Sequence, residues 1–346
     1  MIAAIPYSNK TILICPLDWG LGHAARCVPL IRQLLLQGNR IIVGCTEWQQ
    51  DFIQREVDGL EYASLFGYDV KYSEKFSVGL KILFQFPRLS AIVKKEHVWL
   101  EDFLKENKVD VVISDNRFGL YNENIESVFI THQVFVQAPF LNDLVNKLNS
   151  SYIKKYNQCW VPDHPDMEKS LSGILSHGEN EPRKLKFIGP LSRFTPDKKT
   201  RDKKFSVLVL LSGVEPQRSL LESKLVEALR DVQSVALVRG TKSERKELPS
   251  NFTVIDSANT SELEELLLSS EKIVCRSGYS TLMDLDALGL KALLIPTPGQ
   301  TEQEYLAEYW KEKFGFEMIR QAEINAARLA QWLSSKEIPQ LQKRSG

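Results

Sequence analysis

Short apolar runs alternate with amphipathic stretches along the first half of this chain. In residues 11–16 and 40–45 the apolar side chains are nearly continuous, which is typical of strands buried on both faces of a parallel sheet. Residues 24–37 instead repeat apolar side chains at helical spacing and end before Gly38. We expect further strands at residues 62–65, 109–114, 127–131 and 158–161, and helices at residues 47–56 and 76–107 with a break at Pro87.

A polar stretch interrupts this pattern, and the alternation of strands and helices starts again behind it. The stretch includes the charged run 197–204, which we interpret as a solvated linker, with a phosphate- or headgroup-binding patch as the alternative. Two successive α/β units with parallel sheets and helices on both faces are therefore predicted. The strands of the second unit are expected at residues 205–211, 234–238, 252–256, 272–276 and 292–296, and its helices at 219–230, 260–269, 279–288, 302–313 and 322–335.

The composition is that of a large globular protein. The 346 residues correspond to two domains at roughly 150 residues each. Hydrophobic residues make up 43% and charged residues 25%, which excludes disordered and fibrous classes. Lys+Arg and Asp+Glu both number 44, so the net charge is zero and no nucleic-acid partner is expected. The five cysteines form no CxxC pair, which favours the cytoplasm, and we expect no signal peptide and no membrane span.

The first strand–helix junction, residues 18–23, has the sequence DWGLGH. In open parallel sheets, ligands bind at the carboxyl ends of strands, where helix N-termini present free amides. Gly20 and Gly22 leave the backbone open to an acceptor, and Arg26 follows one turn after His23. The His23 ring is a candidate general base near neutral pH, and a structural cap is an equally weighted alternative.

Two other junctions of the first half should meet the same sheet edge. Asp115, Asn116 and Arg117 follow one strand, and His132 follows the next, between Thr131 and Gln133. Asp115 and His132 are reserve candidates for the base, while Asn116 and Arg117 are candidates for acceptor binding. Ordinary polar loop residues are the alternative for each of them.

Glycines and hydroxyl-bearing residues surround the junction at residues 275–281 of the second half. Free amides and hydroxyls there suit a diphosphate, with N-capping by Ser277 or Ser280 as the alternative. Asp284, one turn into the helix, could accept hydrogen bonds from the hydroxyls of a ribose. The loop 296–304 offers polar groups to a sugar, with a solvated helix entry as the alternative. The predicted donor-binding residues are Ser212, Gly213, Arg276, Ser277, Gly278, Ser280, Thr281, Asp284, Gln300, Glu302 and Gln303.

Several other chemistries lack their motifs. The chain contains no GxxxxGK[ST], no GxSxG and no HExxH sequence. His164 and His177 have no partners at metal-ligand spacing. We therefore expect no metal and no cofactor.

The combination of two α/β halves, a GLGH loop and CRSG opening a helix resembles the GT-B glycosyltransferases. The chain is most similar to the peptidoglycan lipid-intermediate N-acetylglucosaminyltransferase family over residues 11–321, most strongly over residues 273–307. This resemblance implies two Rossmann-like domains that face each other across a cleft. We place an acceptor-binding domain at residues 1–194, a linker at 195–204 and a nucleotide-sugar-binding domain at 205–321. The final helix, 322–335, is expected to pack back on the first domain.

The resemblance also implies a role for individual residues. Ser212 and Gly213 correspond to the family's diphosphate turn, and Asp284 stands where the family has a ribose-binding glutamate. Gln303 falls in a pair that binds sugar hydroxyls, whose other member is Glu304. Such enzymes transfer a hexose from a nucleoside-diphosphate sugar, which is their co-substrate, and require no metal; the family's GGTGGH loop is DWGLGH in this chain.

We therefore expect a transferase that moves a sugar from a UDP-linked donor to an acceptor hydroxyl in cell-envelope or polysaccharide synthesis. A non-hydrolysing sugar-nucleotide epimerase and a catalytically silent nucleotide-sugar-binding subunit are the alternatives. The acceptor is unknown, with a lipid-linked molecule as one candidate. The apolar residues of the stretch 78–86 are expected in the core; a contact with the inner face of the plasma membrane, aided by Lys71, Lys75, Lys81 and Arg88, is the alternative.

Overall fold

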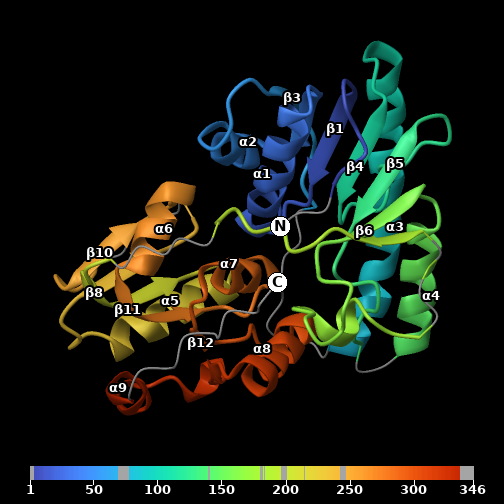
Figure 1. Ribbon diagram of the computed structural model, residues 1–346. Coiled ribbons are helices and arrows are strands. Elements are labelled where there is room, and N and C mark those ends of the chain that lie inside the picture. The colour runs from blue at the N-terminus through green and yellow to red at the C-terminus, as the bar shows by residue number, and fades with distance from the viewer. Residues whose placement is uncertain are drawn as a thin grey trace. The chain divides into compact units, whose positions relative to one another are not determined.

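The computed structural model describes two compact α/β units, Met1–Leu191 and Ser192–Gly346. The described residues are 4–68, 78–138, 141–179, 182, 184–195, 201–213, 215–241 and 247–335, and for residues 78–88 the description covers the helical backbone only. The predicted linker, 195–204, begins three residues after the second unit does, and its residues 196–200 lie outside the described part. In Figure 1 the first unit runs from blue to green and the second from yellow-green to red.

The first unit contains a parallel sheet that has seven strands within the described residues, in the order β3-β2-β1-β4-β5-β6-β7. All six predicted strands are present, shifted by no more than two residues at either end or not at all, while β7 was not predicted. The first strand, with Ile12, Leu13 and Ile14 all fully buried, shows that both faces of the sheet are covered. The strands are β1 (Thr11–Pro16), β2 (Arg40–Cys45), β3 (Glu61–Ser64), β4 (Val111–Asp115), β5 (Glu126–Ile130), β6 (Gln158–Val161) and β7 (Leu185–Phe187).

The second unit repeats this arrangement with a six-stranded parallel sheet, counted over the described residues, in the order β10-β9-β8-β11-β12-β13. Val207, Leu208 and Val209 are all fully buried, so both faces of this sheet are also covered. The predicted α/β class with two parallel sheets is thus confirmed. The strands are β8 (Phe205–Leu210), β9 (Val235–Val238), β10 (Phe252–Ile255), β11 (Ser270–Cys275), β12 (Leu293–Leu294) and β13 (Glu317–Met318).

Helices flank both sheets (Figure 1). In the first unit, Leu100 of α3 packs on Leu13 and Val112 in one apolar cluster. The apolar stretch 78–86, for which core and membrane positions were considered, lies outside the described side chains. The helices are α1 (Leu21–Leu36), α2 (Glu47–Gln54), α3 (Val78–Glu106), α4 (Asn142–Ile153), α5 (Gln217–Ala228), α6 (Thr260–Leu268), α7 (Tyr279–Leu288), α8 (Thr301–Phe314) and α9 (Ala326–Ser334), with short 3-10 turns at Gly173–Leu175 and Gln321–Glu323.

The final helix, α9, lies in the core of the second unit. Leu329 is fully buried and Trp332 is 5% exposed, and both pack with Leu221 and Leu225 of α5 and with the strands β8 and β9. These contacts lie within the second unit, and the packing of this helix on the first domain stays a prediction. Its apolar side chains cover a face of the second sheet that would otherwise be exposed to water.

The strand order of each sheet reverses at one point, and this determines where polar residues gather. In the first sheet β1 lies between β2 and β4, and in the second β8 lies between β9 and β11. The connections run in opposite directions from these central pairs, which leaves an opening above the carboxyl ends of the paired strands. Residues that follow β1 and β4, or β8 and β11, are therefore close in space although they are distant in sequence.

Candidate functional site

The loop between β1 and α1 places His23 at the carboxyl edge of the first sheet. Gly20 precedes the helix with a φ of 85°, a left-handed conformation that glycine adopts without strain. The helix begins at Leu21, earlier than the predicted start near His23, so His23 lies within its first turn. The His23 side chain is 16% exposed, which leaves the ring accessible from the solvent side.

Asp115, the last residue of β4, holds both His23 and Arg26. Pro16 and Asp115 are register partners in the β1–β4 pair, so the β1–α1 loop begins directly beside this carboxylate. The His23 Nδ1 atom lies 2.9 Å from Asp115 Oδ2. Arg26 Nε donates to both carboxylate oxygens, at 2.9 and 3.0 Å, and its Nη2 also contacts Oδ1. Because His23 and Arg26 are three residues apart on α1, they share the helix face that meets Asp115.

These contacts fix the charge on each group. Burial by itself raises the pKa of the Asp115 carboxyl, but the Arg26 guanidinium and the His23 ring outweigh it and lower the pKa to about 2. The pKa of His23 is lowered, first by burial and then by the Arg26 charge, against the opposing effect of Asp115. Near pH 7 the pair is therefore a carboxylate and a neutral imidazole. A carboxylate at Nδ1 accepts the Nδ1–H proton, and the Nε2 lone pair is then left to accept another.

The reserve candidates for the base are not suited to that role in this geometry. Asp115 is fully buried and remains ionised as the partner of His23 and Arg26. His132 is 4% exposed, and its Nδ1 lies 3.3 Å from Arg26 Nη1. His132 therefore belongs to the same polar cluster, on the far side of Arg26 from the carboxylate.

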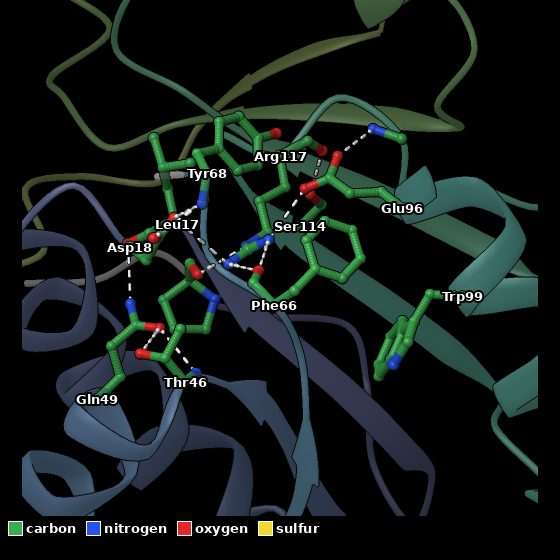
Figure 2. Close-up of polar contacts among 12 residues, drawn as sticks. Leu17, Asp18, Thr46, Gln49, Phe66, Tyr68, Glu96, Trp99, Ser114 and Arg117 are labelled. Carbon is green, nitrogen blue, oxygen red and sulfur yellow. Dashed lines mark hydrogen bonds and ion pairs between the residues drawn. The ribbon is translucent and has the colours of Figure 1, made fainter. Parts of the chain in front are cut away.

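Two arginines predicted to bind the acceptor are buried instead. Arg26 is 2% exposed and holds Asp115, and Arg117 is fully buried among protein oxygens that include Pro16 O and Glu96 Oε1 (Figure 2). Both guanidinium groups therefore donate to protein acceptors in this structure, and acceptor binding by either one stays a prediction. Gly20, Gly22 and Asn116 remain partly exposed, and Asn116 has a φ of 60° in the turn after β4.

In the second unit, the turns after β8 and β11 lie side by side. Leu210 and Cys275, the last residues of these strands, are register partners, so Ser212 and Gly213 come close to Ser277 and Gly278. An added Cβ at Gly278, the N-cap of α7, would meet no atom within 4 Å, and the same is true at Gly213, which has a φ of 96°. Both positions therefore border open space. Ser280 and Thr281 follow in the first turn of α7, half-buried.

Other predicted donor residues build this turn rather than face a ligand. Arg276 is 1% exposed and donates to carbonyl oxygens of Ile295, Pro296 and Gln217, and burial lowers its pKa to about 10. The Ser277 hydroxyl donates to the Gln303 carbonyl oxygen at 2.7 Å. The Arg276 Nη groups and the Ser277 hydroxyl are thus bound by neighbouring loops, whereas the buried Arg276 Nε has no hydrogen-bond partner among the described residues. Direct donor contact by these two side chains stays a prediction.

Asp284, the predicted ribose ligand, already has two partners within its unit. Its Oδ1 accepts from Ser192 Oγ at 2.7 Å and its Oδ2 from Arg193 Nε at 3.3 Å. Burial raises the pKa of this carboxyl, against the opposing effect of the Arg193 charge. A ribose could contact Asp284 only by replacing these partners, and the sequence offered no signal for Ser192 or Arg193.

One buried side-chain amide at the start of α8, that of Gln303, is only partly hydrogen-bonded. Gln303 Oε1 accepts from the backbone N and the hydroxyl of Thr297, at 3.0 and 2.9 Å, while the Gln303 amide nitrogen has no partner among the described residues. Glu304 Oε1 accepts from Gly299 N at 2.9 Å and thereby shapes the loop. Gln300 is the N-cap residue of α8, and Glu302 follows in its first turn, half-buried.

Two further features concern metals and membranes. Within the part of the chain that the structure describes, no group of three or more His, Cys, Asp or Glu side chains is arranged to hold a metal ion. A search of the same residues found no helix with the length and apolar character needed to cross a bilayer.

Comparisons with known proteins agree with this geometry. Residues 214–344 match the glycosyltransferase family 28 C-terminal domain. An uncharacterized glycosyltransferase of Methanosarcina mazei is 23% identical over 333 residues, which cover 87% of this chain and 83% of that protein. A UDP-N-acetylglucosamine--N-acetylmuramyl-(pentapeptide) pyrophosphoryl-undecaprenol N-acetylglucosamine transferase of Desulforudis audaxviator is 33% identical over 163 residues, or 40% of this chain and 43% of the relative.

Solved structures show the same fold over almost the whole chain. The glycosyltransferase of kitacinnamycin matches with a TM-score of 0.62 and 17% identity, over 95% of this chain and 92% of its own. UGT89C1 of Arabidopsis thaliana matches with a TM-score of 0.62 and 15% identity, over 96% of this chain and 91% of its own. The family 28 domain, the glycosyltransferase relatives and this fold together lead to one conclusion: the chain is a glycosyltransferase with the GT-B fold, similar to the peptidoglycan lipid-intermediate N-acetylglucosaminyltransferases.

Proposed function

We propose that this enzyme transfers a sugar from a UDP-linked donor to an acceptor hydroxyl, with His23 as the general base. The observation that carries the proposal is the 2.9 Å contact between His23 Nδ1 and the buried carboxylate of Asp115. That contact orients the ring and selects the tautomer with a free Nε2 lone pair. A lowered pKa keeps this nitrogen unprotonated near pH 7.

The reaction then follows from the two strand ends. His23 Nε2 takes the proton of the acceptor hydroxyl, and the oxygen attacks the anomeric carbon of the donor sugar. The bond between that carbon and the diphosphate oxygen breaks, and both of its electrons leave with the nucleoside diphosphate. The amides at the start of α7 and the open backbone at Gly213 and Gly278 favour the negative charge of the leaving group, so the mechanism we propose requires no metal.

The choice of a UDP donor rests on the relatives. The Desulforudis audaxviator protein is named for UDP-N-acetylglucosamine, and UGT89C1 was solved with UDP-L-rhamnose and with UDP. The Gln303 amide nitrogen offers a hydrogen-bond donor to a sugar hydroxyl. We further propose a role in cell-envelope or polysaccharide synthesis on a lipid-linked acceptor, at the cytoplasmic face of the plasma membrane, because the same relative is named for such an acceptor.

A kinetic experiment on His23 tests the base assignment. Purified protein is incubated with UDP-N-acetylglucosamine, UDP-glucose and UDP-galactose, with and without a synthetic short-chain lipid-diphosphate N-acetylmuramyl-pentapeptide acceptor, and UDP release is measured. His23→Gln should lower kcat by about 10²- to 10⁴-fold, the usual contribution of a general base, and should leave the Kd for UDP unchanged. His177→Gln changes a half-buried histidine of the same unit that contacts Ser176 and Pro165, and its kcat should stay at the wild-type value.

Other outcomes would support the two alternative functions. A donor sugar that isomerises without an acceptor would indicate an epimerase, and tight UDP binding without any turnover would indicate a silent binding subunit. Normal turnover in His23→Gln would refute His23 as the base while leaving the transferase assignment intact.

A further inference from the structure

Arg117, two residues after Asp115 in the chain, occupies the centre of a buried polar network (Figure 2). Its side chain is fully buried. Its Nε donates to Pro16 O at 2.9 Å, and Nη1 and Nη2 each donate to Phe66 O at 3.2 Å. Nη1 also contacts Glu96 Oε1 at 3.0 Å, and Nη2 lies 3.6 Å from Asp18 Oδ1. One guanidinium thus joins the end of β1, the loop after β3 and helix α3.

The acceptors of Arg117 belong to the backbone that carries the proposed base. Pro16 is the register partner of Asp115, and the next residue, Leu17, donates its N–H to Asp115 O at 3.0 Å. The register pairing of the two strands ends at Pro16 and Asp115, and Arg117 adds contacts with Pro16 O and Asp18 at the start of the loop that leads to His23. A shift of these contacts would change the distance between the His23 and Asp115 side chains.

Tyr68 and Gln49 also bind this loop. Both oxygens of Asp18 accept from Tyr68 N, at 3.2 and 3.0 Å. Gln49 of α2 donates its amide to Leu17 O at 2.9 Å, as Figure 2 also shows. The loop is therefore clamped at residues 16, 17 and 18, and Arg117 touches the first and the last of these three.

The chemistry of the network requires arginine. Burial raises the pKa of the Glu96 carboxyl, while the Arg117 charge and the hydrogen bond from the Gly119 N–H lower it. A buried carboxylate of this kind needs a cation as its partner. Pro16 O and Phe66 O need donors in fixed directions at the same time. A guanidinium supplies five N–H groups in a rigid plane, whereas a lysine ammonium could satisfy Glu96 but not the two separated carbonyls as well.

We propose that Arg117 is a positioning residue, which aligns the β1–α1 loop so that His23 Nδ1 meets Asp115. This inference rests on the proposed role of His23 as the base. It replaces acceptor binding as the function of Arg117. The side chain acts through Pro16 and Asp18 and does not touch the substrate.

Arg117→Lys tests the inference because it keeps the charge opposite Glu96, so the chain should still fold. The first readout is the ¹⁵N NMR signal of His23, which is readily assigned because the chain has only five histidines. In the wild type the shifts should report a single tautomer with the proton on Nδ1. In Arg117→Lys they should report a mixture of tautomers. Arg40→Lys provides the matched control, because Arg40 makes a similar two-bond contact with Glu61 on the exposed edge of the same sheet, and its His23 signal should not change.

Kinetics give the second readout, with UDP-N-acetylglucosamine as the donor probe and water or the short-chain lipid diphosphate as acceptor. Arg117→Lys should lower kcat by about 10- to 100-fold, the size expected for a misplacement near 1 Å, with the KM for the donor unchanged. In a His23→Gln background the same substitution should have almost no further effect on kcat, since the group that Arg117 positions is already gone.

The outcomes separate this inference from the proposed function. A folded Arg117→Lys protein with the wild-type His23 tautomer, or a loss in kcat that persists in the His23→Gln background, would overturn the positioning role. If Arg117→Lys does not fold, Asp18→Asn weakens the same clamp at a half-buried position, and an unchanged His23 signal in that variant would also overturn it. Normal turnover in His23→Gln would refute the base and leave the NMR result to decide the role of Arg117.

Discussion

Two buried aspartates, Asp115 in the first unit and Asp284 in the second, show how differently the two strand-end regions are built. Asp115 is fully buried, with two contacts from Arg26 Nε and one from His23 Nδ1, and its pKa falls to about 2. Asp284 is 8% exposed, has one hydroxyl partner and one longer arginine contact, and its pKa is raised. Burial is similar in the two cases, so the number and geometry of the cationic contacts decide whether a carboxylate is stable as a charge.

The difference extends to the groups around each aspartate. The first unit gathers charged and titratable side chains that originate from α1, β4 and the segment after β5, namely His23, Arg26, Asp115 and His132. The second unit offers glycine backbone and helix amides with open space above them at Gly213 and Gly278. In the function we propose, the first region moves a proton and the second holds a diphosphate.

The largest effect should follow the loss of charge at Asp115. We expect Asp115→Asn to lower the free energy of unfolding at pH 7 by about 3–5 kcal/mol, because Arg26 then stays buried without a counter-charge. Denaturant titration followed by circular dichroism would measure it. A loss below about 1 kcal/mol would mean that Arg26 finds another partner, and the contrast with Asp284 would disappear.

The pH dependence of turnover should report the lowered pKa of His23. The imidazole must be neutral to accept a proton, so kcat should fall as the pH drops through its folded pKa, which lies below the ordinary value of about 6.5. The same shift costs folding stability below about pH 6.5, since the unfolded chain then binds more protons. An acid limb above pH 6.5, or one that survives in His23→Gln, would contradict this assignment.

A glycine substitution should affect binding in the second unit without affecting folding. Gly278 has a φ of −72°, and a Cβ there meets no atom within 4 Å, so Gly278→Val should leave the free energy of unfolding nearly unchanged. The added side chain would occupy the space where the diphosphate approaches, and we expect the Kd for UDP to rise by about 10- to 100-fold, or roughly 1.4–2.8 kcal/mol. Calorimetry with Gly278→Ala as the intermediate step would check this, and equal affinity in all three proteins would place the diphosphate elsewhere.

The smallest effect should come from Asp284. A carboxyl with a raised pKa costs stability above its unfolded value of about 3.9, and that cost is present at pH 7. Asp284→Asn removes the cost and gives up the contact with Arg193, so the free energy of unfolding should change by less than about 1 kcal/mol. A loss as large as that of Asp115→Asn would show that Arg193 depends on the Asp284 charge, and that the two aspartates are alike after all.

Local sequence was a reliable guide to the elements and to individual junctions. Continuous apolar runs predicted β1, β2 and β8 to within one residue at each end, because a strand buried on both faces has no polar position. Short strands such as β7 and β13 went unpredicted, since three or two residues carry no period. The start of α1 was placed too late, because glycines at positions 20 and 22 resemble loop residues although the helix already begins at Leu21.

The sequence alone determined that this chain forms two parallel α/β units, with polar junctions at the carboxyl ends of their strands and a glycosyltransferase-like segment in the second. Only the tertiary structure decided which polar residues serve a ligand and which serve the fold. His23 and Asp115 are 92 positions apart and become a pair because β1 and β4 are neighbours, whereas Arg117, Arg276 and Ser277 turn their polar atoms toward backbone carbonyls. The packing of α9 in the second unit was likewise decided by the tertiary structure. The physical reason is that residue type sets which bonds a group can make, while burial and the nearest partner, which depend on contacts distant in sequence, set which of them it does make.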